Sequence, residues 1–267
     1  MTLVDAVDAQ PSGYRAVART VTADCPVTLH QRGRHYLITS CGQVLMGTED
    51  TGSERALGHL AARRLRHIPR PRILVGGLGM GFTLRALLDG LPEGARVVVA
   101  ELLRSVVRWN RTRFARLSGH PLDDPRVRLH IGDVTTLLCR RAAWDAIVLD
   151  VDNGPAWMVQ RRNQALYGRR GLARLLASLR PGGFLALWSV GRDLPFERRL
   201  ASMRLRPRRF RRVARDDGTD EPLIYVVAAP VAARRQEADA PAIRSRHERP
   251  MVRRARPRPA GASVTRA

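Results

Sequence analysis

Short apolar runs alternate with longer amphipathic stretches between residues 72 and 189 of this chain. The apolar runs predict buried strands over residues 72–75, 95–100, 127–131, 146–149 and 184–189. The stretches between them predict helices over residues 82–89, 103–117 and 163–179, with a short helix that begins at Val134. Because strands and helices alternate, we expect a parallel sheet with helices on both of its faces.

The segments on either side of this alternation have the pattern of antiparallel hairpins. Residues 26–46 contain short extended runs broken by two glycine-containing pairs. Two further runs, at 210–213 and 223–228, are separated by the polar sequence DDGTDEP. The expected fold class is therefore α/β, with a Rossmann-like, mostly parallel seven-stranded sheet, a C-terminal antiparallel hairpin and a small N-terminal β-hairpin unit.

These patterns divide the chain into four segments. Residues 1–26 have no clear period and are expected to be a loosely ordered lead-in, and residues 27–50 form the small β unit. Residues 51–230 form the Rossmann-like domain, which opens on a helix capped by Ser53 and ended by Pro69. Residues 231–267 are rich in Arg, Pro and Ala without a period, and we expect a disordered tail there.

The strong positive charge adds nucleic acid to the classes of partner considered. The 267-residue chain has a formal net charge of +23, and all 47 of its basic residues are arginine. Residues 198–216 contribute +8 of this charge and residues 231–267 contribute +7. An arginine-only composition is typical of a GC-rich genome, so RNA or an anionic surface is the less favoured interpretation of the charge.

Cysteine, histidine and apolar patterns exclude other classes of protein. Cys25, Cys41 and Cys139 show no C-x-x-C spacing, so we expect free thiols rather than disulfides or a zinc ribbon. The seven histidines show no recurring ligand spacing, and we expect no metal site. No apolar stretch reaches the roughly 20 residues of a membrane span, and residues 1–25 lack a signal-peptide core. We therefore expect a soluble, cytoplasmic protein with no membrane partner.

Candidate binding chemistry lies at four consecutive strand ends. The first strand runs into the glycine-rich loop of residues 76–81 and then into a helix, an arrangement that can hold a ligand close to the backbone. Glu101, Asp133 and Asp150 follow the next three strands. Because carboxyl ends of parallel strands share one edge, these acids are expected to face one cleft.

Each of these residues also has a purely structural interpretation. Glycines serve ordinary strand-to-helix turns, and Asp133 and Asp150 have the residue type of helix N-caps. An NAD-type Rossmann enzyme would share the same first half. The Gly132-Asp133 pair, which suits an adenine amino group, and the closing hairpin favour an adenosyl-sulfonium ligand instead.

Five motifs then carry a resemblance to a known family. They are VGGLGMG (75–81), Glu101, IGD (131–133), WDAIVLDVDNGP (144–155) and LRPGGFLALWS (179–189). With these motifs, residues 27–229 resemble the spermidine synthase-like family, which has the fold of class I AdoMet-dependent methyltransferases. The resemblance implies transfer of an aminopropyl group from decarboxylated AdoMet to a small amine in polyamine biosynthesis.

The resemblance also implies roles for individual residues. Asp150 would draw a proton from the attacking amine and position it, and Asp152 would add a second anionic contact. The donor, decarboxylated AdoMet or AdoMet, would be held by Gly76, Gly77, Gly79, Gly81, Glu101, Gly132 and Asp133.

The chain departs from the family pattern in three places. The glycine loop lacks the family's acid, the D-x-x-D-P segment is shortened in 150–155, and the family's Gln and Tyr correspond to Leu45 and Glu54. The missing acid favours an AdoMet-dependent methyltransferase as the alternative. A noncatalytic nucleoside- or RNA-binding protein is the third hypothesis, and the sequence leaves a homodimer open.

Three further side chains lie near the expected cleft. Trp157 would either cover the bound nucleoside or anchor the next helix, and packing is the favoured interpretation. Tyr167 would either donate a hydrogen bond to a substrate or pack in the core. Ser189 ends a strand close to the cleft and is a nonspecific contact.

Overall fold

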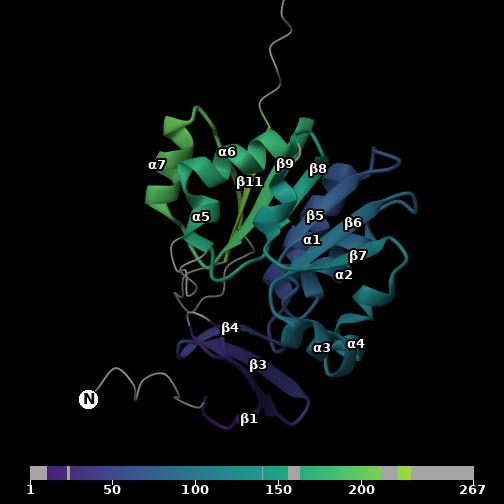
Figure 1. Ribbon diagram of the computed structural model, residues 1–267, viewed down its shortest axis with the longest axis vertical. Helices are drawn as coiled ribbons and strands as arrows, with labels where there is room; N and C mark the ends of the chain where they lie inside the picture. Colours follow the sequence, from purple (N-terminus) through teal and green to yellow (C-terminus); the bar gives the residue numbers. More distant parts are fainter. Residues whose placement is uncertain (1–10, 23–24, 140, 156–162, 212–221, 230–267) are drawn as a thin grey trace, which may run out of the picture. The chain divides into compact units, whose positions relative to one another are not determined.

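Two β-sheets with flanking helices make up the described part of the chain (Figure 1). The structure is a computed structural model, and it describes residues 11–22, 25–139, 141–155, 163–211 and 222–229. The expected tail over residues 231–267 lies outside these ranges. Within them, no helix is long and apolar enough to cross a membrane.

The larger sheet has seven strands in the order β10-β11-β9-β8-β5-β6-β7. Their bounds are β5 (Arg72–Gly76), β6 (Arg96–Glu101), β7 (Val127–Ile131), β8 (Trp144–Leu149), β9 (Leu179–Ser189), β10 (Arg208–Arg211) and β11 (Leu223–Ala228). Strands β5 to β9 pair in parallel, whereas β11 runs antiparallel to β9 and β10 antiparallel to β11. The predicted fold class, including the closing hairpin, is confirmed.

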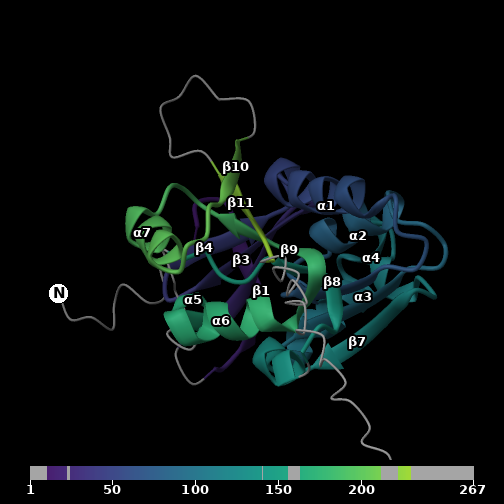
Figure 2. The same ribbon diagram turned by 90° about the horizontal axis from the view of Figure 1, so that it is seen from above.

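Helices cover both faces of this sheet, as the alternating pattern predicted. Their bounds are α1 (Gly52–Leu65), α2 (Phe82–Asp89), α3 (Arg104–Thr112), α4 (Ala115–Ser118), α5 (Gln164–Tyr167), α6 (Arg169–Ser178) and α7 (Leu194–Ser202), with 3-10 turns η1 (Pro121–Asp123) and η2 (Val134–Cys139). Figure 2 shows α1 and α2 on one side of the sheet and α5 and α6 on the other. Successive side chains of β5 accordingly join different cores, Ile73 and Val75 with α1 and α2 and Leu74 with α5 and α6.

The smaller sheet has four antiparallel strands in the order β1-β2-β3-β4. These are β1 (Arg15–Thr20), β2 (Val27–Arg32), β3 (His35–Ser40) and β4 (Gln43–Gly47). A third core joins this sheet to the rest of the molecule, because Leu29 and Ile38 pack with Phe82 of α2 and Trp109 of α3. The small sheet is therefore held against the N-terminal end of α2, beside the carboxyl ends of the parallel strands.

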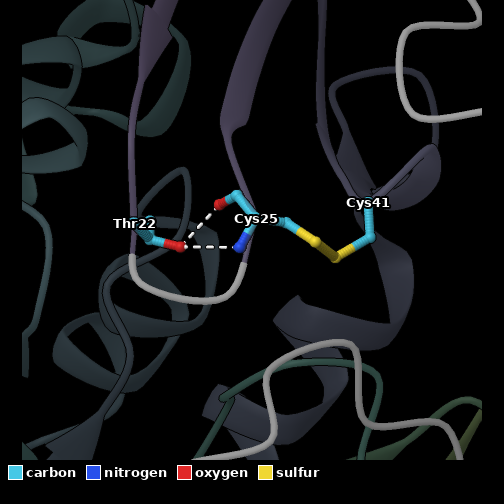
Figure 3. The surroundings of a disulfide bond; sticks show 3 residues. All are labelled: Thr22, Cys25 and Cys41. Atoms are coloured by element: carbon cyan, nitrogen blue, oxygen red, sulfur yellow. Dashed lines mark hydrogen bonds between the residues drawn. A yellow bond between two sulfur atoms is a disulfide. The ribbon is translucent and has the colours of Figure 1, made fainter. Parts of the chain in front are cut away.

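A disulfide closes one end of the small sheet, contrary to the expectation of free thiols. Cys25 and Cys41 are bonded, with their Cα atoms 5.4 Å apart (Figure 3). Val27 of β2 pairs with Ser40 of β3, so the antiparallel register brings the residues just beyond these strand ends together. The Thr22 hydroxyl also accepts a hydrogen bond from the Cys25 N–H at 3.1 Å. The expectation of a free thiol holds for Cys139, which is unpaired and exposed.

The helices expected over residues 103–117 and 163–179 are each divided in two, and β9 begins at Leu179 rather than at residue 184. The structure differs from the expected elements in three further places. Strand β1 lies inside the expected lead-in, because it pairs with β2 and so starts the small unit at Arg15. The N-cap residue of α1 is Thr51 and not the expected Ser53. The Ser53 hydroxyl donates to the Glu54 carboxylate at 2.6 Å. Helix α7 was not expected at all, although Asp193 caps it by accepting from the Phe196 N–H at 2.8 Å.

Candidate functional site

One cleft lies where the carboxyl ends of β5, β6, β7 and β8 approach the small sheet. The small sheet supplies an apolar wall made of Val27, Ile38, Leu45 and Met46. Five acids from other elements also line it, namely Glu54, Glu101, Asp133, Asp150 and Asp152. Among the lining residues that the structure describes there is no arginine, lysine or histidine. We call this site the acidic cleft, and its composition is opposite in sign to the +23 chain that surrounds it.

Glu101 ends β6 and holds the glycine loop in place. Its side chain is buried, and its carboxylate accepts hydrogen bonds from the N–H groups of Leu78 at 3.0 Å and Leu103 at 2.8 Å. Burial raises the pKa of Glu101, and the backbone hydrogen bonds oppose that shift. The N–H groups of Leu102 and Gly79 also interact with this carboxylate, so backbone donors surround the side chain that lines the cleft at the end of β6.

Asp150 directly follows β8 and lines the acidic cleft. Its backbone N–H donates to the Gly76 carbonyl at 2.8 Å, and its carboxylate accepts from the Thr83 hydroxyl at 2.5 Å. Burial raises the pKa of Asp150, whereas the bond from Thr83 lowers it. This environment favours a carboxylate that takes up a proton more readily than one in water.

Glu54 is a cleft residue to which the sequence analysis assigned no catalytic or binding role. It lies in the first turn of α1 and is only 7% exposed, yet it lines the acidic cleft. Burial and, to a smaller extent, the charge of Asp150 raise the pKa of Glu54 to about 7. The sequence signal was its correspondence to a family tyrosine, but a glutamate in a first helical turn is also typical of an ordinary helix start.

Asp152 is held at the mouth of the cleft by the segment that follows β8. Its backbone has a φ of +61°, and its carboxylate accepts from the Asn153 N–H at 2.9 Å and from the Asn163 side chain at 3.1 Å. Asn163 also lines the cleft. These two donors fix the orientation of the carboxylate. The positive φ of Asp152 is a backbone conformation that few non-glycine residues adopt.

Asp133 lines the cleft and also accepts a backbone hydrogen bond at the start of the turn that follows it. It is exposed and lines the cleft together with Gly132, while its carboxylate accepts from the Thr135 N–H at 2.8 Å at the start of η2. The Gly132 N–H donates to the Glu101 carbonyl at 2.9 Å, which joins the ends of β6 and β7. The structural interpretation and the binding interpretation of Asp133 are therefore compatible.

The glycine loop approaches its neighbours too closely for side chains. A Cβ at Gly77, whose φ is +84°, would lie 2.1 Å from the Asp150 carbonyl oxygen. At Gly79 (φ +52°) a Cβ would lie 2.8 Å from the Met46 sulfur, so Met46 fills the space beside this loop position. Gly77 and Gly79 line the cleft. Gly76, at the end of β5, and Gly81, just before α2, are not among its lining residues, although both were expected to hold the donor.

The remaining predicted contacts lie elsewhere. The Tyr167 hydroxyl is buried and donates to the Val151 carbonyl at 3.3 Å, and the Ser189 hydroxyl donates to the Gly191 carbonyl at 2.8 Å. Neither residue lines the cleft, whereas Trp188 does. Trp157 lies outside the described residues. In the described ranges, no group of three or more His, Cys, Asp or Glu residues could hold a metal ion.

Comparisons with known proteins place these observations among relatives. No protein-family model matches the chain. It is 37% identical over 143 residues to a polyamine aminopropyltransferase of Nitrosomonas europaea, a match that covers 51% of this chain and 41% of that protein. It is 36% identical over 124 residues to polyamine aminopropyltransferase 2 of Pseudomonas aeruginosa, covering 45% of this chain and 33% of that protein. The matches thus span less than half the length of these curated relatives.

Solved structures share the fold at low sequence identity. A spermidine synthase of Thermotoga maritima has a TM-score of 0.63 at 14% identity, covering 81% of this chain and 73% of that chain. A spermidine synthase in complex with the transition-state analogue AdoDATO has a TM-score of 0.62 at 15% identity, with the same coverage of both chains. The resemblance to the spermidine synthase-like family is therefore confirmed, in sequence over about half of the chain and in fold over four fifths of it.

Proposed function

We propose that the chain transfers an aminopropyl group from decarboxylated AdoMet to an amine, as a step of polyamine biosynthesis. The observation that carries the proposal is the acidic cleft, which is lined by five carboxylates and by no cationic side chain among the described residues. Both reactants of this transfer are cations, because the donor bears a sulfonium and an ammonium and the acceptor is an ammonium at neutral pH. The names of the matched relatives support the same reaction.

The donor would lie along the glycine loop. Glu101 lines the cleft at the end of β6, where its carboxylate would accept hydrogen bonds from ribose hydroxyls, and Asp133 lies at the adjacent strand end. AdoMet carries a carboxylate that the decarboxylated donor lacks. Because like charges repel in a site of low dielectric, five acids disfavour AdoMet and favour the decarboxylated donor.

Asp150 would prepare the acceptor for attack. A primary ammonium with a pKa of about 10.4 must lose one proton before its nitrogen can act as a nucleophile. The proton passes to a cleft carboxylate, the nitrogen bonds to the propyl carbon, and the electrons of the broken C–S bond remain on sulfur as a neutral thioether. Asp150, with its raised pKa and its fixed hydrogen bond to Thr83, suits the uptake and the positioning.

Methyl transfer from AdoMet on the same fold is the second candidate. One observation favours it, because Gly79 and the Met46 sulfur occupy the part of the loop where family members carry an acid for the donor's amine. The two candidates predict opposite ligand preferences.

A thermal-shift comparison of AdoMet, decarboxylated AdoMet and methylthioadenosine separates them, since a ligand that binds only the folded state raises its melting temperature. A larger shift with decarboxylated AdoMet, together with methylthioadenosine release when an amine is added, supports aminopropyl transfer. A larger shift with AdoMet supports methyl transfer. No shift with any of the three contradicts both.

A further inference from the structure

The acidic cleft contains two acidic residues on separate elements, and the side chain of Thr83 contacts the carboxylate of one and the backbone of the other. The Thr83 hydroxyl of α2 donates to the Asp150 carboxylate at 2.5 Å and lies 3.2 Å from the Glu54 backbone carbonyl. Glu54 and Asp150 both line the same cleft. They are therefore neighbours through Thr83, and we call their side chains the paired carboxylates.

The packing of α1 against α2 fixes Glu54 in this place. Gly58 lies one turn after Glu54 on the same helical face, and a Cβ there would lie 2.4 Å from the Thr83 carbonyl oxygen. The missing side chain lets the two helices approach closely. This close approach carries the first turn of α1, and with it Glu54, to the end of β8.

No cationic side chain accompanies the paired carboxylates among the described residues that line the cleft. The groups that act on the Glu54 carboxylate are Asp150 from the end of β8, Asp50 from the segment before α1, and the Ser53 hydroxyl. Two neighbouring buried carboxylates do not both ionise readily unless a proton or a cation lies between them. The raised pKa of Glu54, about 7, agrees with a proton held there in the free protein.

We propose that Glu54 is a specificity-determining residue that, with Asp150, binds the ammonium group of the amine acceptor. This inference rests on the proposed function and adds a second carboxylate at the nitrogen that reacts. An ammonium has three N–H donors, so it can bind both carboxylates at once. Its entry displaces the proton held by the pair, and the proton that the nitrogen loses before attack returns to one of the two carboxylates.

Isothermal titration of 1,4-diaminobutane into the full chain saturated with methylthioadenosine tests this inference. The titration is repeated at pH 7 in buffers of different ionisation enthalpy, which reports the protons released on binding. The wild type is compared with Glu54→Gln, with Glu54→Asp, and with Glu93→Gln as a control, because Glu93 is exposed and lies outside the cleft. Methylthioadenosine affinity of each variant shows whether the nucleoside site remains folded.

We expect the wild type and Glu93→Gln to release about half a proton per diamine bound, as a group with a pKa near 7 would at pH 7. Glu54→Gln should bind the diamine at least about tenfold more weakly with no such release, and Glu54→Asp should recover part of both. Methylthioadenosine affinity should be the same in all four proteins.

The inference is overturned if Glu54→Gln binds the diamine with wild-type affinity and proton release, or if the wild type binds no diamine. The proposed function fails separately, if the wild type binds the diamine but forms no methylthioadenosine from decarboxylated AdoMet. In that case the paired carboxylates remain an ammonium site without the transfer reaction.

Discussion

Replacing Glu54 with Gln should make the ligand-free protein more stable above neutral pH. The pKa of Glu54 is raised from 4.5 to about 7 in the folded protein, chiefly by burial and then by Asp150. A carboxyl with a raised pKa contributes stability that is fully present below pH 4.5 and is lost as the pH rises through about 7. At 1.4 kcal/mol per pKa unit, the loss is roughly 3 kcal/mol. Glutamine cannot ionise and avoids it.

Urea denaturation of the wild type and the variant between pH 5 and pH 8 measures this difference. The excess free energy of unfolding of Glu54→Gln should grow from less than about 1 kcal/mol at pH 5 to about 3 kcal/mol at pH 8. Asp150 also has a raised pKa, but it is present in both proteins, so its pH dependence largely cancels in the comparison. Curves that stay parallel across this range, as we expect for the exposed Glu93→Gln control, would refute a neutral Glu54 in the free protein.

Four further outcomes are expected. Asp150→Asn should lower turnover by at least about 100-fold while methylthioadenosine still binds, and unchanged turnover would exclude this residue from the mechanism. Glu101→Ala should weaken methylthioadenosine binding about tenfold or more in a titration, and equal affinity would contradict its role at the ribose. Gly58→Ala should cost about 2 kcal/mol in chemical denaturation, because the new Cβ would lie 2.4 Å from a backbone oxygen; a neutral result would mean that α1 shifts freely. Reducing the Cys25–Cys41 disulfide, whose partners are 16 residues apart, should lower stability by about 3 kcal/mol, and a melting temperature insensitive to reductant would argue against the bond.

The fold could be predicted from the sequence because its strongest signal is periodic. The central parallel strands β5 and β8 are buried on both faces and appear as continuous apolar runs, and the helices between strands show an apolar stripe. Helix α7 was not predicted, because residues 194–202 lie in an arginine-rich region and only Phe196 and Leu200 of this helix are buried. The charged residues of α7 obscure its short amphipathic pattern.

The cleft could be predicted only where its residues follow parallel strands. Glu101, Asp133 and Asp150 follow a topological rule, so their meeting at one edge did not depend on tertiary packing. Glu54 reaches the cleft through the packing of α1 on α2, and Met46 through the docking of the small sheet. Neither contact can be inferred from the spacing of residues along the sequence. The disulfide was missed for the same reason, since it follows from strand register rather than from a cysteine motif.

The cleft is acidic, whereas the chain as a whole carries a net positive charge. The rate at which an amine arrives and the affinity with which it is held therefore depend on charges of opposite sign. Outside the cleft, the net charge of +23 repels an approaching polyamine, and dissolved ions screen this repulsion beyond the Debye length of about 10 Å at 0.1 M salt. Within the cleft, the charged side chains among the described lining residues are all carboxylates. Added salt should therefore speed the arrival of the amine while it weakens the bound state, so that the entry and exit rates both rise with ionic strength.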